Sequence, residues 1–553
     1  IPKIISPGFN GNNVMQFVRH KNKGFRRSRL LNIAQKKGVK KYLGAKSIKT
    51  ILDKIDDISI VKKKLTIVIN EELDKIKNIF ENKKYLGDNK SLADAWDELI
   101  TENTQRIKVK RCIAQLIECC DNEGVISVLK GANTNVTYYR TILDFEEEDK
   151  ENRKRSTDYF VKRLVFMTNY VKTVYDRFRG KYWIRSTGSD PHKDAQHTLF
   201  LVNKETSQIE CVYKPHDLTA DAAVLDKKDS MFVQVNKLIR EPFTEKCKEL
   251  GLDIGENTDA LATMDIKIGE HTEELIKKKD EMTPDEAKVY FFRAGILKAI
   301  TDAMAIIDLH ADNIMPTEQG PMIIDAEIDF FHYGDHSMFA TGPGNALSAT
   351  NFCKYIFNSV FTICTEEGGR IESGDAFQSN EMPYYDMYKE GYNFMVKQMK
   401  LKKNKKTFGH KFEKQLKRVN MVRLLPIGTG DFADYLQKAV KSRGTITEIT
   451  DNLVIKIKEG LCSEKANFLN SKFAKVELDD EILNFALLTT LENGTIPAMY
   501  ADMEGYIYLD NIIVGSIVAK EGKKASAINI GKKQLIEIIK GCFFETIHKF
   551  KPI

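Results

Sequence analysis

The feature that most constrains the fold is a change in hydrophobic spacing along the chain. From about residue 47 to 120, and again from Tyr159 to Phe178, apolar residues recur at the spacing of amphipathic helices. In residues 197–202 and 209–214 the spacing becomes alternating, and a polar turn separates these two short runs. Such a pair of runs predicts an antiparallel β-hairpin. The chain is therefore expected to be an α+β protein that begins with a helical region.

The length of the chain predicts more than one hydrophobic core, because 553 residues exceed what a single core supports. The charged stretch Asp144–Arg155 interrupts the helical pattern and predicts a linker or a highly solvated turn. We expect a basic, helical region over residues 1–155, a β-containing lobe over residues 156–280 and a further lobe over residues 281–553.

Four later segments have recognisable patterns. Residues 287–307 predict a buried helix, and residues 322–324 a short apolar strand. Residues 419–425 form another apolar segment, and residues 479–518 predict a helix followed by a hairpin. The region from residue 334 to 406 is rich in Gly, Ser, Asn and Tyr, which predicts long loops.

The composition is that of a folded protein with few special demands. Hydrophobic residues make up 42% and charged residues 29%, and 85 basic residues nearly balance 78 acidic ones, for a net charge of +7. This balance predicts no nucleic-acid partner. Basic residues do cluster in residues 21–64 and 400–406. These clusters are interpreted either as solvated faces or as docking sites for an acidic peptide, a phosphate-rich ligand or a membrane surface.

Cysteine usage and hydropathy predict a cytoplasmic protein. The nine cysteines include no Cys-x-x-Cys pair, which favours a reducing compartment. No apolar run is long enough for a membrane span, and the N-terminus lacks the apolar segment of a signal peptide. The first residue is Ile, which predicts a trimmed or processed chain.

Two polar features flank the predicted hairpin. Lys214 ends its second strand, where a lysine could reach the phosphates of a nucleotide, although a lone lysine at a strand end is usually a surface residue. The loop that contains Gly188, Ser189, Asp190 and His192 precedes the first strand, so it could cover phosphates; as an isolated turn it would carry no meaning.

A second set of polar residues follows the predicted buried helix and strand. Asp308, His310 and Asn313 come directly after the helix, and Asp325 and Glu327 come directly after the strand. This order is typical of phosphoryl-transfer sites, in which one acid orients the attacking hydroxyl while amide and carboxylate oxygens bind Mg²⁺. The alternative is a group of ordinary turn residues. Together with Lys214, the set predicts an ATP- and Mg²⁺-dependent phosphotransferase.

Other enzyme classes are disfavoured by the motifs that the sequence lacks. There is no His-Glu-x-x-His motif or close Cys/His cluster for a zinc hydrolase, and no Gly-x-Ser-x-Gly motif for a serine hydrolase. The Gly-x-x-x-x-Gly-Lys-Ser/Thr loop of P-loop enzymes is also absent.

At these residues, and over roughly residues 160 to 515, the sequence resembles the dehydratase domain of class II lanthipeptide synthetases, whose fold is related to lipid kinases. The segments that carry the resemblance are Gly188-Ser-Asp190-Pro-His192, Val212-Tyr-Lys214-Pro215 with Asp221, Asp308-Leu-His310-Ala-Asp-Asn313, Ile324-Asp325-Ala-Glu327, Arg423 with Thr429, and Gly494-Thr-Ile496-Pro497. Each is short, and their common order gives the resemblance its specificity.

The resemblance implies a bilobal, kinase-like core with its N-lobe in residues 156–280 and its C-lobe in residues 281–553. It implies an enzyme that uses ATP and Mg²⁺ to phosphorylate Ser or Thr in a peptide or protein, and then eliminates the phosphate to leave a dehydroamino acid. The implied roles are ATP binding by Lys214 with Gly188 and Ser189, catalysis of transfer by Asp308 and His310, metal binding by Asn313, Asp325 and Glu327, and elimination by Asp190, His192, Arg423 and Thr429.

The sequence also departs from the family pattern. His216 stands where the family has Arg, Thr495 stands where it has Asp, and Pro426 and Gly428 are inserted beside Arg423. The chain ends where a cyclase domain would begin and lacks its zinc ligands, so ring formation is not expected. Two alternatives remain: a kinase that stops at the phosphorylated product, and a nucleotide-binding module without turnover.

Overall fold

The structure is a computed structural model with helices and mainly antiparallel sheets, which confirms the α+β prediction. It describes residues 103–135, 140–141, 150–189, 191–306, 309, 313–326, 362–364, 370–372, 384–427, 432, 435–436, 446–462, 474–521 and 524–553. The first basic cluster and most of the helical region predicted over residues 47–120 therefore lie outside the described residues.

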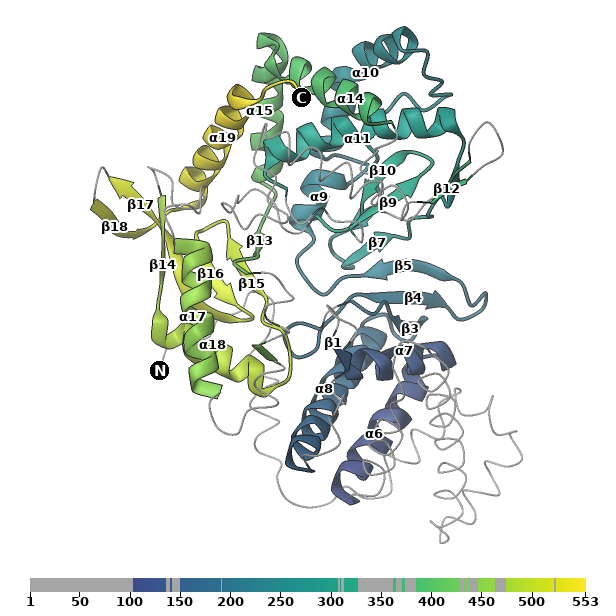
Figure 1. The fold of residues 1–553 in the computed structure, drawn as a ribbon. Coiled ribbons are helices and arrows are strands. Elements are labelled where there is room, and N and C mark those ends of the chain that lie inside the picture. The colour runs from purple at the N-terminus through teal and green to yellow at the C-terminus, as the bar shows by residue number, and fades with distance from the viewer. Residues whose placement is uncertain are drawn as a thin grey trace.

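The first described part is a group of helices against one face of a five-stranded antiparallel sheet (Figure 1). The helices are α6 (Asn103–Cys119), α7 (Asn122–Asn133) and α8 (Lys150–Arg177), and a short pair, β1 (Thr134–Asn135) and β2 (Arg140–Thr141), follows α7. The strand order is β3 (Tyr182–Ser186), β4 (Leu199–Asn203), β5 (Ile209–Tyr213), β7 (Thr272–Glu274) and β6 (Ile266–Lys267).

The β4–β5 pair confirms the predicted hairpin, with Phe200 opposite Val212. The prediction for residues 144–155 was wrong in its last part, because α8 already begins at Lys150. Apolar residues that recur at helical spacing further along α8, such as Phe160 and Leu164, are fully buried. Burial of this apolar face stabilises the helix as a whole, so the helix extends back through the charged residues at its start.

A second group of helices surrounds a buried central helix, α11. The group consists of α9 (Thr219–Leu225), α10 (Met231–Glu249), α11 (Pro284–Met304), α14 (Tyr385–Lys400), α15 (Lys402–Leu416) and α19 (Lys532–Lys549). Helix α11 begins at a capping box formed by Thr283 and Glu286 and ends at Ala305, which has left-handed backbone angles. The predicted buried helix is thus confirmed, whereas α14 lies in a region predicted to be loops.

Short strands lie beside α11 and carry the chain toward the predicted polar residues. A hairpin of β9 (Ile314–Thr317) and β10 (Gly320–Ile323) confirms the predicted apolar strand. A separate small sheet joins β8 (Glu281–Met282), β11 (Thr362–Cys364) and β12 (Arg370–Glu372). The β9–β10 hairpin faces the end of β5, so residues after each strand come close together (Figure 1).

The last part of the chain forms another antiparallel sheet, covered by two helices. The strands are β13 (Met421–Leu424), β15 (Met499–Asp502), β16 (Tyr506–Leu509), β17 (Ile512–Glu521), β14 (Ala474–Leu478) and β18 (Lys524–Asn529), and the helices are α17 (Ile446–Cys462) and α18 (Asp480–Glu492). The apolar segment at 419–425 contains β13, and the predicted helix and hairpin at 479–518 are confirmed.

Two hydrophobic cores divide the described residues. One joins α6, α7 and α8 to β3, β4 and β5 and includes Tyr213, and the other begins at Leu218 and includes residues of the later helices and of the last sheet. Helices α9 and α10 therefore share a core with α11. The domain boundaries at residues 155 and 280 stay predictions.

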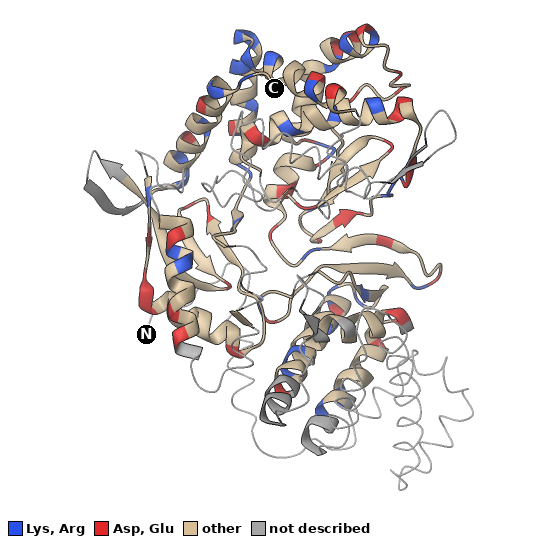
Figure 2. Ribbon diagram, viewed as in Figure 1, with Lys and Arg blue, Asp and Glu red and all other residues tan. Residues whose placement is uncertain are grey.

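Charge and hydropathy on the described elements add two observations. The basic cluster at residues 400–406 lies at the start of α15, where Lys402 and Lys403 are exposed (Figure 2). Among the described helices, none combines the length and the apolar character that a membrane crossing requires.

Candidate active site

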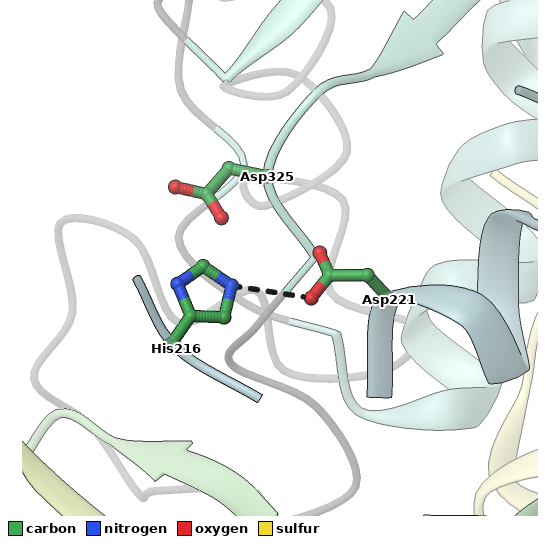
Figure 3. A group of neighbouring side chains, drawn as sticks. All are labelled: His216, Asp221 and Asp325. Atoms are coloured by element: carbon green, nitrogen blue, oxygen red, sulfur yellow. Dashed lines mark hydrogen bonds and ion pairs between the residues drawn. The ribbon is translucent and has the colours of Figure 1, made fainter. Parts of the chain in front are cut away.

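Three chain segments place polar side chains together between the first sheet and the β9–β10 hairpin. His216 follows β5, Asp221 lies in α9 and Asp325 follows β10. Ligand atoms of these three residues lie within 4.8 Å of one another (Figure 3). The His216 Nε2 atom is 3.3 Å from Asp221 Oδ2, and the Ala326 N–H donates to Asp221 Oδ1 at 3.1 Å.

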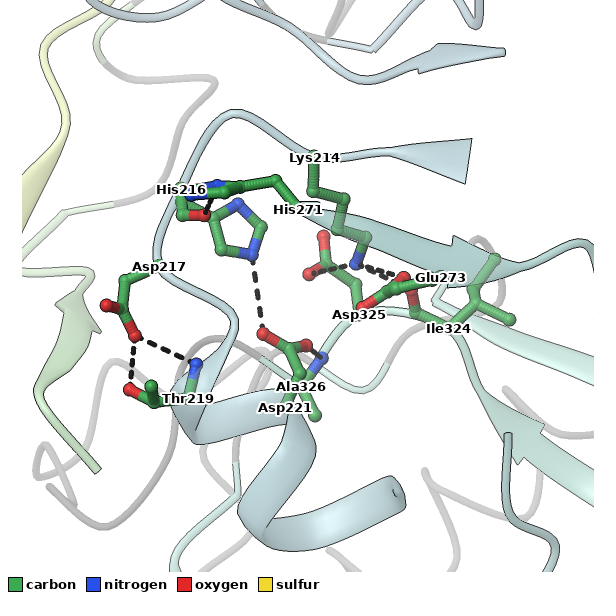
Figure 4. A network of polar contacts seen from close by, with 10 residues as sticks. All are labelled: Lys214, His216, Asp217, Thr219, Asp221, His271, Glu273, Ile324, Asp325 and Ala326. Carbon is green, nitrogen blue, oxygen red and sulfur yellow. Dashed lines mark hydrogen bonds and ion pairs between the residues drawn. The ribbon is translucent and has the colours of Figure 1, made fainter. Parts of the chain in front are cut away.

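Lys214 connects this group to the first sheet. Its backbone N–H donates to His271 O, which continues the β5–β7 pairing, and its side chain is 5% exposed. The Lys214 Nζ atom donates to Ile324 O at 2.8 Å and to Asp325 Oδ1 at 3.1 Å, and it lies 3.2 Å from Glu273 Oε2 (Figure 4). The lysine and the aspartate predicted to share one site are therefore in direct contact.

The electrostatics of this group follow from its burial. Burial alone would lower the pKa of Lys214, but the carboxylates of Asp325, Glu273 and Asp221 outweigh it and raise that pKa above its ordinary value. Burial raises the pKa of Glu273 to about 8 despite the nearby ammonium. For Asp221, burial is outweighed by Lys214, His216 and the Ala326 N–H, which lower its pKa to about 2. At neutral pH the group thus contains a charged Lys214 and a charged Asp221.

A second group joins the loop before β4 to the last sheet. The guanidinium of Arg423, on β13, donates to His192 Nε2 at 3.0 Å, and His192 Nδ1 lies 3.3 Å from Ile496 O. Since an arginine can only donate, Nε2 is the acceptor and Nδ1 carries the proton. Burial and the charge of Arg423 lower the pKa of His192 well below its ordinary value. This histidine is therefore neutral.

The loop that carries His192 has an unusual backbone. Lys193, Asp194 and Ala195 all have positive φ angles, of 28°, 52° and 59°. The loop closes through a bond from the His192 N–H to Gln196 O, and Ile496 N–H donates to Pro191 O. Non-glycine residues in this conformation are strained. The loop therefore holds His192 against the 494–497 segment at a conformational cost.

The two groups act on one another electrostatically. Tyr500 lies opposite Arg423 in the β13–β15 pair. Burial raises the pKa of Tyr500. The charge of Arg423 opposes this increase, whereas the charge of Asp325, in the first group, adds to it. The charge of His216 likewise contributes to the lowered pKa of His192. The residues around Lys214 and the residues around Arg423 are therefore close enough to influence one another's pKa values.

The other predicted residues have the following positions. The backbone oxygen of Asn313 accepts from the Ile324 N–H at 3.0 Å, which places Asn313 beside Asp325. Gly188, with a φ of 87°, and Ser189, whose hydroxyl accepts from the Thr198 N–H, close the loop that leads to His192. Five predicted residues lie outside the described residues, namely Asp190, Asp308, His310, Glu327 and Thr429.

Sequence reasoning did not assign roles to Glu273, Asp221 or His216. Asp221 gave a usable signal, because it is the one charged residue in the apolar run of α9, where a carboxylate needs a buried partner. Glu273 gave none, since it belongs to a short polar strand, Thr-Glu-Glu.

Comparison with known proteins gives two matches. A family profile described as a domain of unknown function, DUF4135, matches residues 182–365. The lacticin 481/lactococcin biosynthesis protein LcnDR2 of Lactococcus lactis subsp. lactis is 28% identical over 140 residues, which is 25% of this chain and 14% of that protein. The matched part is therefore a small fraction of the relative. The segment that contains Lys214 and Asp325 is thus the part of the chain that matches DUF4135, and the chain has distant similarity to a lacticin 481/lactococcin biosynthesis protein.

Proposed function

We propose that this chain is an ATP- and Mg²⁺-dependent enzyme that phosphorylates Ser or Thr hydroxyls of a peptide or protein and then eliminates the phosphate. The observation that carries the proposal is the contact of buried Lys214 with Asp325 at the end of β5. The resemblance to lanthipeptide dehydratase domains and the similarity to a lacticin 481/lactococcin biosynthesis protein support a peptide as the substrate. ATP as cosubstrate places the reaction in the cytoplasm.

In the proposed transfer step, the first sheet and the helices around α11 act as the two lobes of a kinase-like core. Lys214 binds the ATP phosphates from the sheet side, and Glu273 and Asp325 keep its ammonium charged and oriented. Asp308, which follows α11 in the sequence, is proposed to accept the proton of the substrate hydroxyl as its oxygen attacks the γ-phosphorus and ADP leaves. His310, two residues later in the sequence, is the second residue proposed for this step.

The residues proposed to bind the metal have side chains of a suitable type. Asn313, Asp325 and Glu327 offer amide and carboxylate oxygens, the ligand type that Mg²⁺ prefers. Asp325 keeps one oxygen that Lys214 does not bind. Bound there, Mg²⁺ would neutralise charge on the ATP phosphates.

In the proposed elimination step, a base among the residues proposed for elimination takes up the Cα proton of the phosphorylated residue. The electrons of that C–H bond form the Cα–Cβ double bond, and the Cβ–O bond breaks as phosphate leaves. Arg423 provides a cation for the departing phosphate. His192 accepts a hydrogen bond from that guanidinium and donates to Ile496 O, so its contribution in this arrangement is to orient Arg423. Asp190 and Thr429 complete the proposed set.

Intact-mass measurement tests the proposal. The purified chain is incubated with ATP, Mg²⁺ and a synthetic Ser/Thr-rich peptide. Loss of water from the peptide supports phosphorylation followed by elimination, and gain of phosphate alone supports a kinase that stops at the phosphorylated product. An unchanged peptide, together with ATP binding that requires Lys214, would favour the nucleotide-binding module.

Variants test whether the assigned residues are needed for the reaction. Asp308→Ala and Lys214→Ala should each leave the peptide mass unchanged. Lys204→Ala serves as the matched control, because this lysine lies in the turn between β4 and β5 and contacts Tyr175 instead of the site. Full phosphorylation by Asp308→Ala would show that the assigned base is wrong.

A further inference from the structure

His216, Asp221 and Asp325 form a mixed nitrogen and oxygen donor set beside the proposed ATP site. They come from three segments and converge on one point (Figure 3). The side chain of Asp221 is fully buried and that of His216 is 9% exposed. Lys214 binds only one oxygen of Asp325, so the other remains for a ligand.

The separation between His216 and Asp221 matches two ligands of one metal ion. Their facing atoms lie 3.3 Å apart, which is long for a hydrogen bond between a nitrogen and a carboxylate oxygen. Metal–nitrogen and metal–oxygen bonds of about 2.1 Å that meet at a tetrahedral or octahedral angle put neighbouring ligand atoms roughly 3.0 to 3.4 Å apart. A cation between these two atoms thus needs little rearrangement of the backbone.

The charge around the group also favours a cation. Among the described residues, Asp221, Glu273 and Asp325 surround one ammonium, that of Lys214 (Figure 4). Glu273 is 4% exposed, and its Oε1 atom has no hydrogen-bond partner in the described part of the chain. Buried carboxylates are normally paired or bound to metal.

We propose that His216, Asp221 and Asp325 bind a divalent first-row transition metal. The imidazole nitrogen decides the class of ion, because Mg²⁺ prefers oxygen ligands whereas first-row transition metals accept imidazole together with carboxylates. Mn²⁺ is the probe, because its electron paramagnetic resonance spectrum reports its ligands. It is also the weakest binder of the first-row divalent ions. Asp325 is then shared with the proposed Mg²⁺ site, and the role of the metal in the reaction, unlike its binding, rests on the proposed function.

The test measures Mn²⁺ binding without nucleotide. Electron paramagnetic resonance of free Mn²⁺ gives the affinity and the number of bound ions, and spin-echo modulation of the bound ion detects a coordinated imidazole nitrogen. Wild type should bind one Mn²⁺ at this site with nitrogen coupling. His216→Gln keeps an amide that can bond to Asp221 but should lose the coupling and weaken binding at least about tenfold. Asp221→Asn should weaken binding to a similar extent.

Two further variants complete the design. His410→Gln is the matched control, because His410 is an exposed histidine of α15 outside the site, and it should bind as wild type does. His216→Arg places a permanent cation among the carboxylates and should exclude the ion while preserving the fold. Absence of nitrogen coupling in wild type, or equal affinity in His216→Gln, would overturn the proposal.

The outcomes also separate this site from the proposed function. Mn²⁺ binding with nitrogen coupling but no phosphate transfer would support the metal site and remove the proposed function. Phosphate transfer with Mg²⁺ in a chain that shows no nitrogen coupling would support the proposed function and overturn the metal site.

Discussion

At the scale of single residues, Arg423 illustrates how a side chain is prepared for one role. His192 accepts from its guanidinium, and Ile496 O fixes the tautomer of that histidine. The strained loop at residues 193–195 in turn holds the histidine in place. A cation in such a fixed position suits a departing phosphate, because little reorganisation is needed when the charge develops.

Replacement of Arg423 should therefore separate the two proposed steps. In Arg423→Ala, phosphorylated peptide is expected to accumulate, with elimination slowed roughly 100-fold or more because the departing phosphate lacks its cation. Arg423→Lys should restore part of the rate. Mass spectra taken over a time course give both rates. Arg418→Ala is the control, since Arg418 precedes the same strand but pairs with Asp229. Unchanged elimination in Arg423→Ala would remove Arg423 from the mechanism.

Asp510 is a second residue whose environment sets its protonation. It accepts from the Ala498 N–H at 3.0 Å and contacts the Thr490 hydroxyl at 2.7 Å. That hydroxyl also lies 3.0 Å from Ala486 O and has only one proton to donate. A protonated Asp510 can donate to Thr490 and satisfy both contacts. Burial raises the pKa of Asp510 to about 6, in agreement with this arrangement.

The raised pKa predicts the pH dependence of an Asp510 variant. Folding favours the neutral acid, so the stability of wild type falls as the pH rises from the unfolded pKa through about 6, by at most roughly 3 kcal/mol. Asp510→Asn imitates the neutral acid and avoids this loss. In urea unfolding, its free energy of unfolding should exceed that of wild type by more at pH 8 than at pH 5. Asp510→Ala, which leaves Ala498 N–H without its acceptor, should be less stable than the Asn variant at both pH values.

At the scale of elements, the crossing of α11 and α14 depends on two glycines. A Cβ atom at Gly295 would lie 2.0 Å from Tyr388 O, and one at Gly391 would meet Phe292 O equally closely. Each helix thus lies directly against the backbone of the other. This close approach fixes α11, which precedes the predicted residues Asp308 and Asn313 in the sequence.

Substitution at this crossing should destabilise the protein. Gly295→Ala forces the two helices apart, and we expect the free energy of unfolding to fall by roughly 1–3 kcal/mol or more. Gly541→Ala is the matched control, because Gly541 lies in helix α19 with no atom within 4 Å of an added Cβ. There alanine should stabilise by about 0.5–1 kcal/mol. Urea unfolding of both variants gives the comparison, and a neutral Gly295→Ala would contradict the close packing.

At the scale of the whole molecule, helix α8 ties the first hydrophobic core to the last sheet. The buried side chain of Arg163 donates from Nε to Gly494 O at 2.9 Å, across 331 residues of sequence. Ile496, two residues later, carries the carbonyl that orients His192. The positions of Arg423 and His192 thus depend on contact between two distant parts of the chain.

Loss of this contact should be visible in hydrogen exchange. In Arg163→Met the Gly494 carbonyl loses a charged donor, and we expect a loss of roughly 1.5–3 kcal/mol and faster amide exchange both at residues 494–496 and in the loop around His192. Lys162→Ala is the control, because Lys162 reaches the neighbouring Glu492 O only through an exposed bond. Faster exchange confined to α8 would show that the contact does not hold the loop.

The sequence by itself determined the elements and the first pair of site residues. Alternating and helical spacings predicted the β4–β5 hairpin, α11 and β10, because these periods report which face of an element is buried. Lys214 and Asp325 were predicted to meet, although 111 residues separate them, because each follows a short strand in an order typical of phosphoryl transfer.

Only the tertiary structure decided the rest of the site. Glu273 reaches Lys214 through strand pairing between β5 and β7, and Asp221 faces His216 through the packing of α9. Arg423 meets His192 because the last sheet lies against the loop before β4. Local sequence patterns report the burial of a face, whereas the partner of a buried charge depends on which distant segment the fold brings beside it.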